Sequence, residues 1–363
     1  MSRQTPPSSV ADYVSRRQLL SVTDIVRPAW CEYEFQYGVL SLSHLPLARR
    51  PSEITTPEGN TIVPSYVELQ QREKVFQAGT GVHTAIEQFV HPDQVELTPV
   101  TMEDRWALRF IECASGVTHA VKGRAREIPV FGMLNGHPVH GIIDELRRDG
   151  DMLVLAETKT RGTQSLPSTE DQRQARIQCM IYRRLYQGLW EAGKQLDLGG
   201  FAHAIGLRLE RELSEPFTAE LAANPSVMPW RATPTHPTLQ DIAALAQDAL
   251  RTSALPISRA MELVYVQRKR ERDSCMYEPT EVGRVRFDAD DTLDAHLNHV
   301  FPLLHGTRLP RGVPEALASR CNRCAWRDGC EWRAKQAAAA SNDAALWTEY
   351  ADVSDDTLAK LSW

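Results

Sequence analysis

The sequence predicts a globular α/β protein, and three observations support that prediction. Of its 363 residues, 42% are hydrophobic and 24% are charged, which is typical of a folded domain. A helical pattern covers residues 101–120 and 168–192, and Ser168 with Asp171 resembles a capping box at the start of the second helix. Between these helices, residues 126–160 change to the pattern of strands.

Two turn signals organise the strand region. Asn135-Gly136 joins strands expected over 126–132 and 138–147, and Asp149-Gly150 leads into a third strand over 152–160. Such dipeptides between apolar runs are typical of β-hairpins. The sequence therefore predicts a three-stranded meander.

The remaining elements follow the same two periodicities. Glycine weakens a helix, so the pattern over 66–90 is expected to break near Gly79 and Gly81. Residues 45–65 are rich in Pro and Thr and indicate a loop. The other expected helices cover 21–38, 239–252 and 292–304, and the other expected strands cover 201–209, 261–269 and 283–287.

One elaborated domain is expected over residues 21–335, between a disordered tail at 1–20 and a helical tail at 336–363. The first tail holds three arginines and one acid, which is compatible with the end of a mitochondrial transit peptide, but a disordered tail is the favoured interpretation. All apolar runs are far shorter than the roughly 20 residues that cross a membrane. A net charge of -6 argues against whole-surface attraction to nucleic acid, so any such site must be a local basic patch.

The main candidate site combines carboxylates and a lysine. Asp144 and Glu157 are expected on adjacent strands, and Glu157 and Lys159 are two residues apart, so they share a strand face. Buried charges need partners, and hard oxygen ligands favour Mg²⁺ or Mn²⁺. The set suits metal-assisted phosphodiester hydrolysis. The alternative is an ordinary salt bridge between Glu157 and Lys159 on a solvated hairpin.

Two further pairs favour the metal site over that alternative. His83 and Glu87 lie at i and i+4 on one expected helix face, and a histidine beside a carboxylate is a better ligand candidate than a lone histidine. Gln178 and Tyr182 have the same spacing in the helix that follows the Glu157 strand.

A second candidate site is built from cysteines. Seven cysteines without a secretion signal argue against a disulfide framework and for metal binding. Three of them have the spacing C-x2-C-x5-C in a polar stretch. Zinc is the metal that clustered cysteines most generally bind, and an iron–sulfur cluster would need a fourth thiolate. Cys31 is our choice because its surroundings are aromatic-rich, and Cys275 remains a candidate, whereas Cys113 and Cys179 are expected in the core. The three clustered residues are Cys321, Cys324 and Cys330.

Taken in order, these motifs resemble the exonuclease V family, which are iron–sulfur members of the PD-(D/E)XK nucleases related to the RecB and AddB nuclease domains. The resemblance spans residues 21–333 and is specific in the joint order of its elements. Those elements are Cys31 in WCEYEFQYG, His83 in GTGVHTAIE, Asp144 in GIIDEL, Glu157 and Lys159 in ETKTR, Gln178 and Tyr182 in QCMIY, and the cysteine triad.

The resemblance implies a restriction-endonuclease-like core, with a mixed central sheet flanked by helices and a helical iron–sulfur region joining the N- and C-terminal segments. It implies a metal-dependent exonuclease for single-stranded DNA in DNA repair or genome maintenance. His83, Asp144, Glu157 and the Thr158 carbonyl would hold Mg²⁺, with Mn²⁺ as a substitute and Glu87 as a further candidate ligand.

In the same resemblance, Lys159 would orient water or stabilise the transition state, and Gln178 and Tyr182 would position the scissile strand. Cys31 and the triad would hold a [4Fe–4S] cluster. DNA contacts are expected from basic residues, namely Arg161, Arg183, Arg184, Arg268, Lys269 and Arg270.

We further expect a monomer that acts in the mitochondrion or nucleus, with a single-strand-binding protein as a candidate partner and no membrane association. Two other hypotheses compete with this one. The first is a non-catalytic iron–sulfur DNA-binding subunit of a repair complex, against which the intact Asp144, Glu157 and Lys159 set argues. The second is a zinc-containing RNA-processing nuclease, which would be colourless rather than brown.

Overall fold

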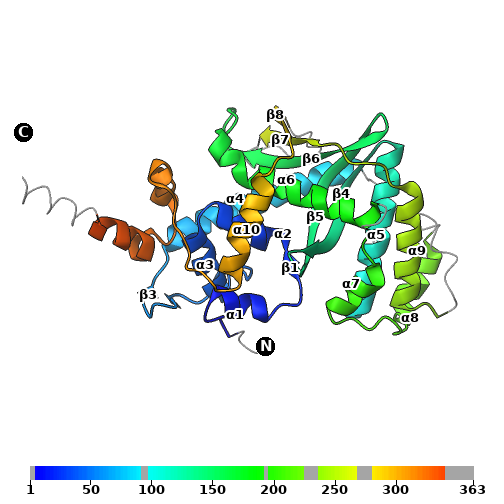
Figure 1. Ribbon diagram of the computed structural model, residues 1–363, viewed down its shortest axis with the longest axis horizontal. Coiled ribbons are helices and arrows are strands. Elements are labelled where there is room, and N and C mark those ends of the chain that lie inside the picture. Colours follow the sequence, from blue (N-terminus) through cyan, green and yellow to red (C-terminus); the bar gives the residue numbers. More distant parts are fainter. Residues whose placement is uncertain (1–4, 91–96, 192–194, 225–235, 268–279, 340–363) are drawn as a thin grey trace, which may run out of the picture.

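The computed structural model describes residues 5–90, 97–191, 195–224, 236–267 and 280–339 (Figure 1). A mixed β-sheet lies at the centre and is flanked by helices, which confirms the predicted α/β class. A smaller helical body, built from the early and the last described segments of the chain, extends from one end of the molecule.

The main sheet contains the predicted meander. β4, β5 and β6 are antiparallel neighbours, β7 adds in parallel to β6, and β8 adds antiparallel to β7. The two-residue strand β1 pairs in parallel with the first part of β5. The strands are β1 (Leu20–Ser21), β4 (Arg124–Leu134), β5 (His137–Asp149), β6 (Met152–Arg161), β7 (Ala260–Gln267) and β8 (Glu281–Asp288).

The Asn135-Gly136 turn sets the register of β4 against β5. Asn135 has φ 47 and Gly136 has φ 79, as a two-residue type I′ turn requires. In the resulting register Arg126 pairs with Glu145, and Ile128 pairs with Ile143.

Two long helices, α5 (Met102–Lys122) and α6 (Thr169–Trp190), pack against β4 and β5. The Ser168 side chain accepts the Asp171 N–H, so the predicted start of α6 is confirmed. The helix α9 (Leu239–Ser253) packs on α5. The other helices are α1 (Val10–Ser15), α2 (Val22–Val26), α3 (Glu32–Leu40), α4 (Tyr66–Val90), α7 (Leu198–Ala204), α8 (Glu215–Ala223) and α10 (Thr292–Leu304), and the short turns η1 (Arg27–Ala29), η2 (Leu47–Arg49), η4 (Glu315–Arg323) and η5 (Arg327–Gly329) are 3₁₀ helices.

The early and late segments of the chain are joined by a separate apolar cluster. Tyr37 packs on Trp326 with ring centroids 5.6 Å apart, and both are buried. The Glu331 carboxylate accepts hydrogen bonds from Thr56 and Asn60. These two residues lie in the turn that joins β2 (Ile54–Thr55) to β3 (Thr61–Ile62). The buried Glu331 therefore ties the last described segment to this hairpin and fixes their relative positions.

Several expected boundaries are wrong. The segment 5–20 is not disordered, because Val10 and Val14 of α1 are buried in the main core and Leu20 pairs with Val139. This segment is ordered by packing against the main core, which its polar composition does not indicate. The predicted helix over 21–38 is divided into α2 and α3 by η1, which contains Pro28.

Two other expectations fail because local signals were misjudged. The helix α4 runs through Gly79 and Gly81 without a break, so these glycines weaken the helix but do not end it. The expected strand over 201–209 does not form: residues 201–204 belong to α7, whose start is capped by the Asp197 side chain, and residues 205–209 contain no strand. Residues 331–339 are helical, and the rest of the expected C-terminal tail lies outside the described residues. None of the described helices is long and apolar enough to span a bilayer.

Candidate functional site

The two predicted carboxylates lie on the adjacent strands β5 and β6. Asp144 is 7% exposed and Glu157 is 2% exposed, because apolar residues on both sides bury these strands. Asp144 Oδ2 accepts the backbone N–H of Thr158 at 2.7 Å, which fixes the aspartate against the neighbouring strand. The Asp144 and Glu157 side chains are thereby held close together and largely shielded from solvent.

Lys159 joins the carboxylates to helix α6. Its Nζ donates to Glu157 Oε1 at 2.7 Å and to Gln178 Oε1 at 2.9 Å. Gln178 Nε2 in turn donates to the Tyr182 hydroxyl at 3.0 Å. The structure thus brings together four residues that the sequence analysis singled out, and their hydrogen bonds orient the lysine toward the carboxylates.

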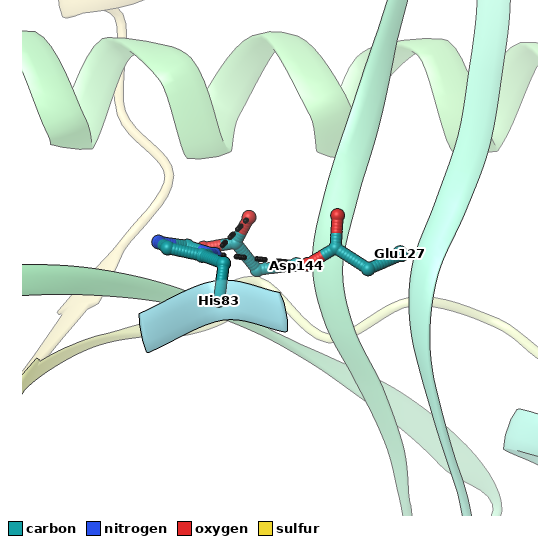
Figure 2. A group of neighbouring side chains, drawn as sticks. All are labelled: His83, Glu127 and Asp144. Carbon is teal, nitrogen blue, oxygen red and sulfur yellow. Dashed lines mark ion pairs between the residues drawn. The ribbon is translucent and has the colours of Figure 1, made fainter. Parts of the chain in front are cut away.

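His83 reaches the same place from α4 (Figure 2). Its Nδ1 lies 3.8 Å from Asp144 Oδ1 and 3.7 Å from Glu127 Oε1. Glu127 was not among the residues chosen from the sequence. The Asn135-Gly136 turn could have revealed it, since the register of that hairpin places residue 127 opposite residue 144. The side chain of Glu87 lies outside the described part of the structure.

The charges of the site raise several pKa values. Burial first, and then the Glu157 charge, raises the pKa of Asp144 to about 7. Burial alone would lower the pKa of Lys159, but the charges of Glu157 and Asp144 outweigh it and raise that pKa. Interaction with Glu127, and then with Asp144, raises the pKa of His83 despite burial. The site therefore concentrates negative charge that a cation would stabilise.

A cavity of about 620 Å³ opens beside Lys159 and Gln178. Arg161 also lines it, together with Tyr265 of β7, and the Arg161 guanidinium lies 5.9 Å from the Tyr265 ring centroid. Arg183 and Arg184 do not line it: they border a different cavity on the far side of α6, where Arg184 pairs with Asp294. The expected contacts at Arg268, Lys269 and Arg270 lie outside the described residues.

The structure gathers three of the four proposed cluster cysteines. Cys31, Cys324 and Cys330 pack against the aromatic cluster that joins the two ends of the chain. Burial raises the pKa of Cys31 to about 12 and that of Cys324 to about 11. Cys321 lies a few residues away in η4, whereas Cys113 and Cys179 are buried in the main core as expected.

Among the described residues, no three cysteine sulfurs lie within 4.8 Å of one another. Within the described residues, the single set of three or more ligand atoms that lie within 4.8 Å of one another belongs to His83, Glu127 and Asp144. A four-iron cluster holds its thiolates at separate corners, so its ligands need not touch. The packing is compatible with such a cluster.

Buried carboxylates beside a lysine on the sheet of an α/β protein are the kinds of side chain that metal-assisted hydrolysis of phosphate esters uses. The family model for exonuclease V, described as a 5′ deoxyribonuclease, matches residues 65–151 and 147–333. An exonuclease V from Danio rerio is 27% identical over 322 residues, which cover 88% of this chain and 71% of that relative.

The chain therefore belongs to the exonuclease V family, and the resemblance inferred from its motifs is confirmed. Membership supports hydrolysis of DNA by an exonuclease. The matched ranges include His83, Asp144 and Glu157 and extend through Cys330, whereas Cys31 precedes them.

The close approach of Tyr182 to β5 depends on Gly141. A Cβ at Gly141 would lie 2.5 Å from Tyr182 Cε1 and 3.0 Å from Val22 Cγ2, which is too close. We therefore expect Gly141→Ala to destabilise the protein by about 1–3 kcal/mol through overpacking, and to displace Tyr182 from Gln178. Denaturant unfolding checks the first effect.

Gly188→Ala is the matched control for this prediction. Gly188 lies inside α6, and nothing lies within 4 Å of an added Cβ there. Alanine should stabilise that helix by about 0.8–1.0 kcal/mol. If Gly141→Ala were as stable as the unmodified protein, the proposed contact between Tyr182 and the sheet would be wrong.

Proposed function

We propose that this protein is a metal-dependent exonuclease that degrades single-stranded DNA from a 5′ end. Family membership supports the exonuclease activity and the 5′ direction. The observation that carries the metal-dependent mechanism is the buried set of Asp144, Glu157 and Lys159 on adjacent strands. We propose that these strands form the centre of a restriction-endonuclease-like core.

The residues present fit a divalent cation. Glu157 Oε2 is buried and has no hydrogen-bond partner among the described residues, and the pKa of Asp144 is raised by burial and by Glu157. An unsatisfied buried carboxylate oxygen costs free energy that a cation would recover. We propose that His83, Asp144, Glu157 and the Thr158 carbonyl hold Mg²⁺, for which Mn²⁺ can substitute, and leave Glu87 as a candidate. The bound ion would supply activation of water and neutralisation of phosphate charge.

Lys159 supplies the second positive charge. With its Nζ held by Glu157 and Gln178, the ammonium is positioned to stabilise negative charge that develops on a phosphate oxygen. The Tyr182 hydroxyl accepts a hydrogen bond from Gln178 Nε2, which keeps the Gln178 side-chain oxygen turned toward the lysine. These two residues position the lysine, and Gln178, which lines the cavity, is placed to contact the strand.

The depth of the site favours a single strand. Asp144 and Glu157 are almost fully buried, and the cavity beside Lys159 is bounded by β6, β7, α6 and the segment of Thr23 and Trp30. A flexible single strand can enter such a recess more readily than a paired duplex can. Arg161 at the cavity wall offers a positive charge for the backbone.

We also propose a structural [4Fe–4S] cluster bound by Cys31, Cys321, Cys324 and Cys330. The packing of three of these residues against one aromatic cluster, far from the carboxylates in sequence, supports this assignment. The cluster would join the ends of the chain, much as a cross-link restricts the unfolded state.

The setting of the activity is proposed from family membership. We place it in DNA repair or genome maintenance, in the mitochondrion or nucleus, with a monomer acting on strands that a single-strand-binding protein covers. The buried helix α1 argues against treating residues 5–20 as a removable transit segment, since removal would expose the core around Val10 and Val14.

The central carboxylates can be tested by isosteric substitution. Asp144→Asn and Glu157→Gln should each lower cleavage of end-labelled single strands in Mg²⁺ by about 10²-fold or more, because they remove ligands of the cation rather than contacts to the strand. Binding of the strand should persist. Turnover assays and fluorescence-anisotropy titrations measure the two effects separately.

Glu145→Gln is the matched control. Glu145 follows Asp144 on the same strand but pairs with Arg126 at 3.0 Å, so its loss should leave cleavage nearly unchanged. Near-normal turnover of Asp144→Asn would refute the metal assignment, and equal losses in all three variants would indicate a general folding defect.

The cluster assignment predicts which cysteines hold iron. Alanine at Cys31, Cys321, Cys324 or Cys330 should each remove the brown colour, lower the Tm and weaken DNA binding, because the ends of the chain lose their cross-link. Iron analysis and visible absorbance of the purified variants measure the loss.

Substitution of Cys113 or Cys179 serves as the control, and Cys275 is a further control outside the described residues. Iron content should be unchanged in all three variants. Full iron retention in Cys31→Ala, or its loss in Cys275→Ala, would contradict the ligand set while leaving the nuclease proposal intact.

A further inference from the structure

Glu127 is the acidic residue of the site that the family motifs did not supply. It lies on β4, opposite Asp144 on β5, and its carboxylate points toward Asp144 and toward His83 of α4 (Figure 2). The three ligand atoms come from three different elements and lie within 4.8 Å of one another. From this convergence, and on the basis of the function proposed above, we infer that Glu127 is a direct ligand of the catalytic cation, together with His83 and Asp144.

The distances indicate that these atoms surround a space instead of bonding to each other. His83 Nδ1 lies 3.7 Å from Glu127 Oε1 and 3.8 Å from Asp144 Oδ1, and both separations exceed a normal hydrogen bond. Glu127 Oε1 is shielded from solvent and has no hydrogen-bond partner among the described residues. Nearby Glu157 is 2% exposed, and its Oε2 also lacks a partner in that part of the chain. Two buried, unsatisfied carboxylate oxygens in one site, of which the Glu127 oxygen lies beside the His83 imidazole, point to a bound cation.

The backbone at Glu127 is a second, independent sign of function. Its φ is 49°, in the left-handed region that residues other than glycine and asparagine rarely adopt. Asn135 has a similar φ, but it lies in a turn that requires it. Glu127 lies inside a strand, where Arg126 and Ile128 on either side keep their regular partners and the pair at 127 is missing from the ladder. Such strain in a strand persists where it places a functional group.

The donor set agrees with the expected metals. Two carboxylates suit Mg²⁺ and Mn²⁺, and an imidazole nitrogen is a better ligand for a transition metal ion than for Mg²⁺, so Mn²⁺ should bind more tightly than Mg²⁺. Asp144 Oδ2 is occupied by the Thr158 N–H, which leaves Oδ1 to face His83 and Glu127.

The test is a titration of the purified full chain with Mn²⁺, followed by electron paramagnetic resonance of the free ion and by calorimetry. We expect Glu127→Gln to raise the Kd for Mn²⁺ by about 10- to 100-fold, in the range seen when groups around a metal are removed. The matched control is again Glu145→Gln, whose carboxylate pairs with Arg126 and should leave the Kd unchanged. An unchanged Kd in Glu127→Gln would overturn the inference.

A double substitution separates direct binding from an effect through His83. If Glu127 only orients the imidazole, His83→Ala with Glu127→Gln should bind Mn²⁺ as weakly as His83→Ala alone, and the inference would be wrong. If Glu127 is a ligand, the double variant should bind more weakly still. Glu127→Gly, which relieves the left-handed backbone, should keep or raise the Tm while losing Mn²⁺ affinity, so misfolding cannot explain the loss.

The outcome also distinguishes this inference from the proposed function. Loss of Mn²⁺ binding in Asp144→Asn with normal binding in Glu127→Gln would overturn only the role of Glu127. Absence of Mn²⁺ binding in the unmodified protein would overturn both.

Discussion

Two carboxylates buried on adjacent strands are the constraint on which the site depends. The pairing of β5 with β6 places Asp144 beside Thr158 and Glu157, in a sheet whose neighbouring positions are apolar. Like charges in such a place oppose folding unless something positive offsets them. Lys159 offsets part of that charge, and its remaining contact with Gln178 ties α6 to the same point.

The rest of the fold supports this pair. Helix α6 covers the sheet because Gly141 lets Tyr182 lie against β5, and α4 brings His83 to the open side of the carboxylates. The early and late segments of the chain meet around Tyr37, Trp326 and Glu331, away from the site. The molecule therefore separates the part that holds the acidic residues from the part that holds most of the cysteines.

Sequence patterns predicted the meander, the helix after it and the meeting of Asp144, Glu157 and Lys159, because turn dipeptides and strand alternation are local signals. The place of Gln178 beside them followed from the family resemblance. The ordering of residues 5–20 was missed because it comes from packing of Val10 and Val14 against distant residues. Glu127 was missed for a different reason: its role depends on hairpin register and on an unusual φ, neither of which composition reveals. The family motifs located Asp144, Glu157 and Lys159, and the structure added Glu127, the residue opposite Asp144.

The central proposal is that this chain is an end-dependent nuclease for single strands whose cleavage depends on a cation held by the buried carboxylates. The most direct measurement compares a circular single strand with the same strand after linearisation, labelled at its 5′ end and incubated with the purified protein in Mg²⁺ or in EDTA. The account predicts that the linear strand is degraded in Mg²⁺ with release of the 5′ label, that the circle remains intact and that EDTA stops the reaction. Cleavage of the circle, or degradation of the linear strand in EDTA, would contradict it.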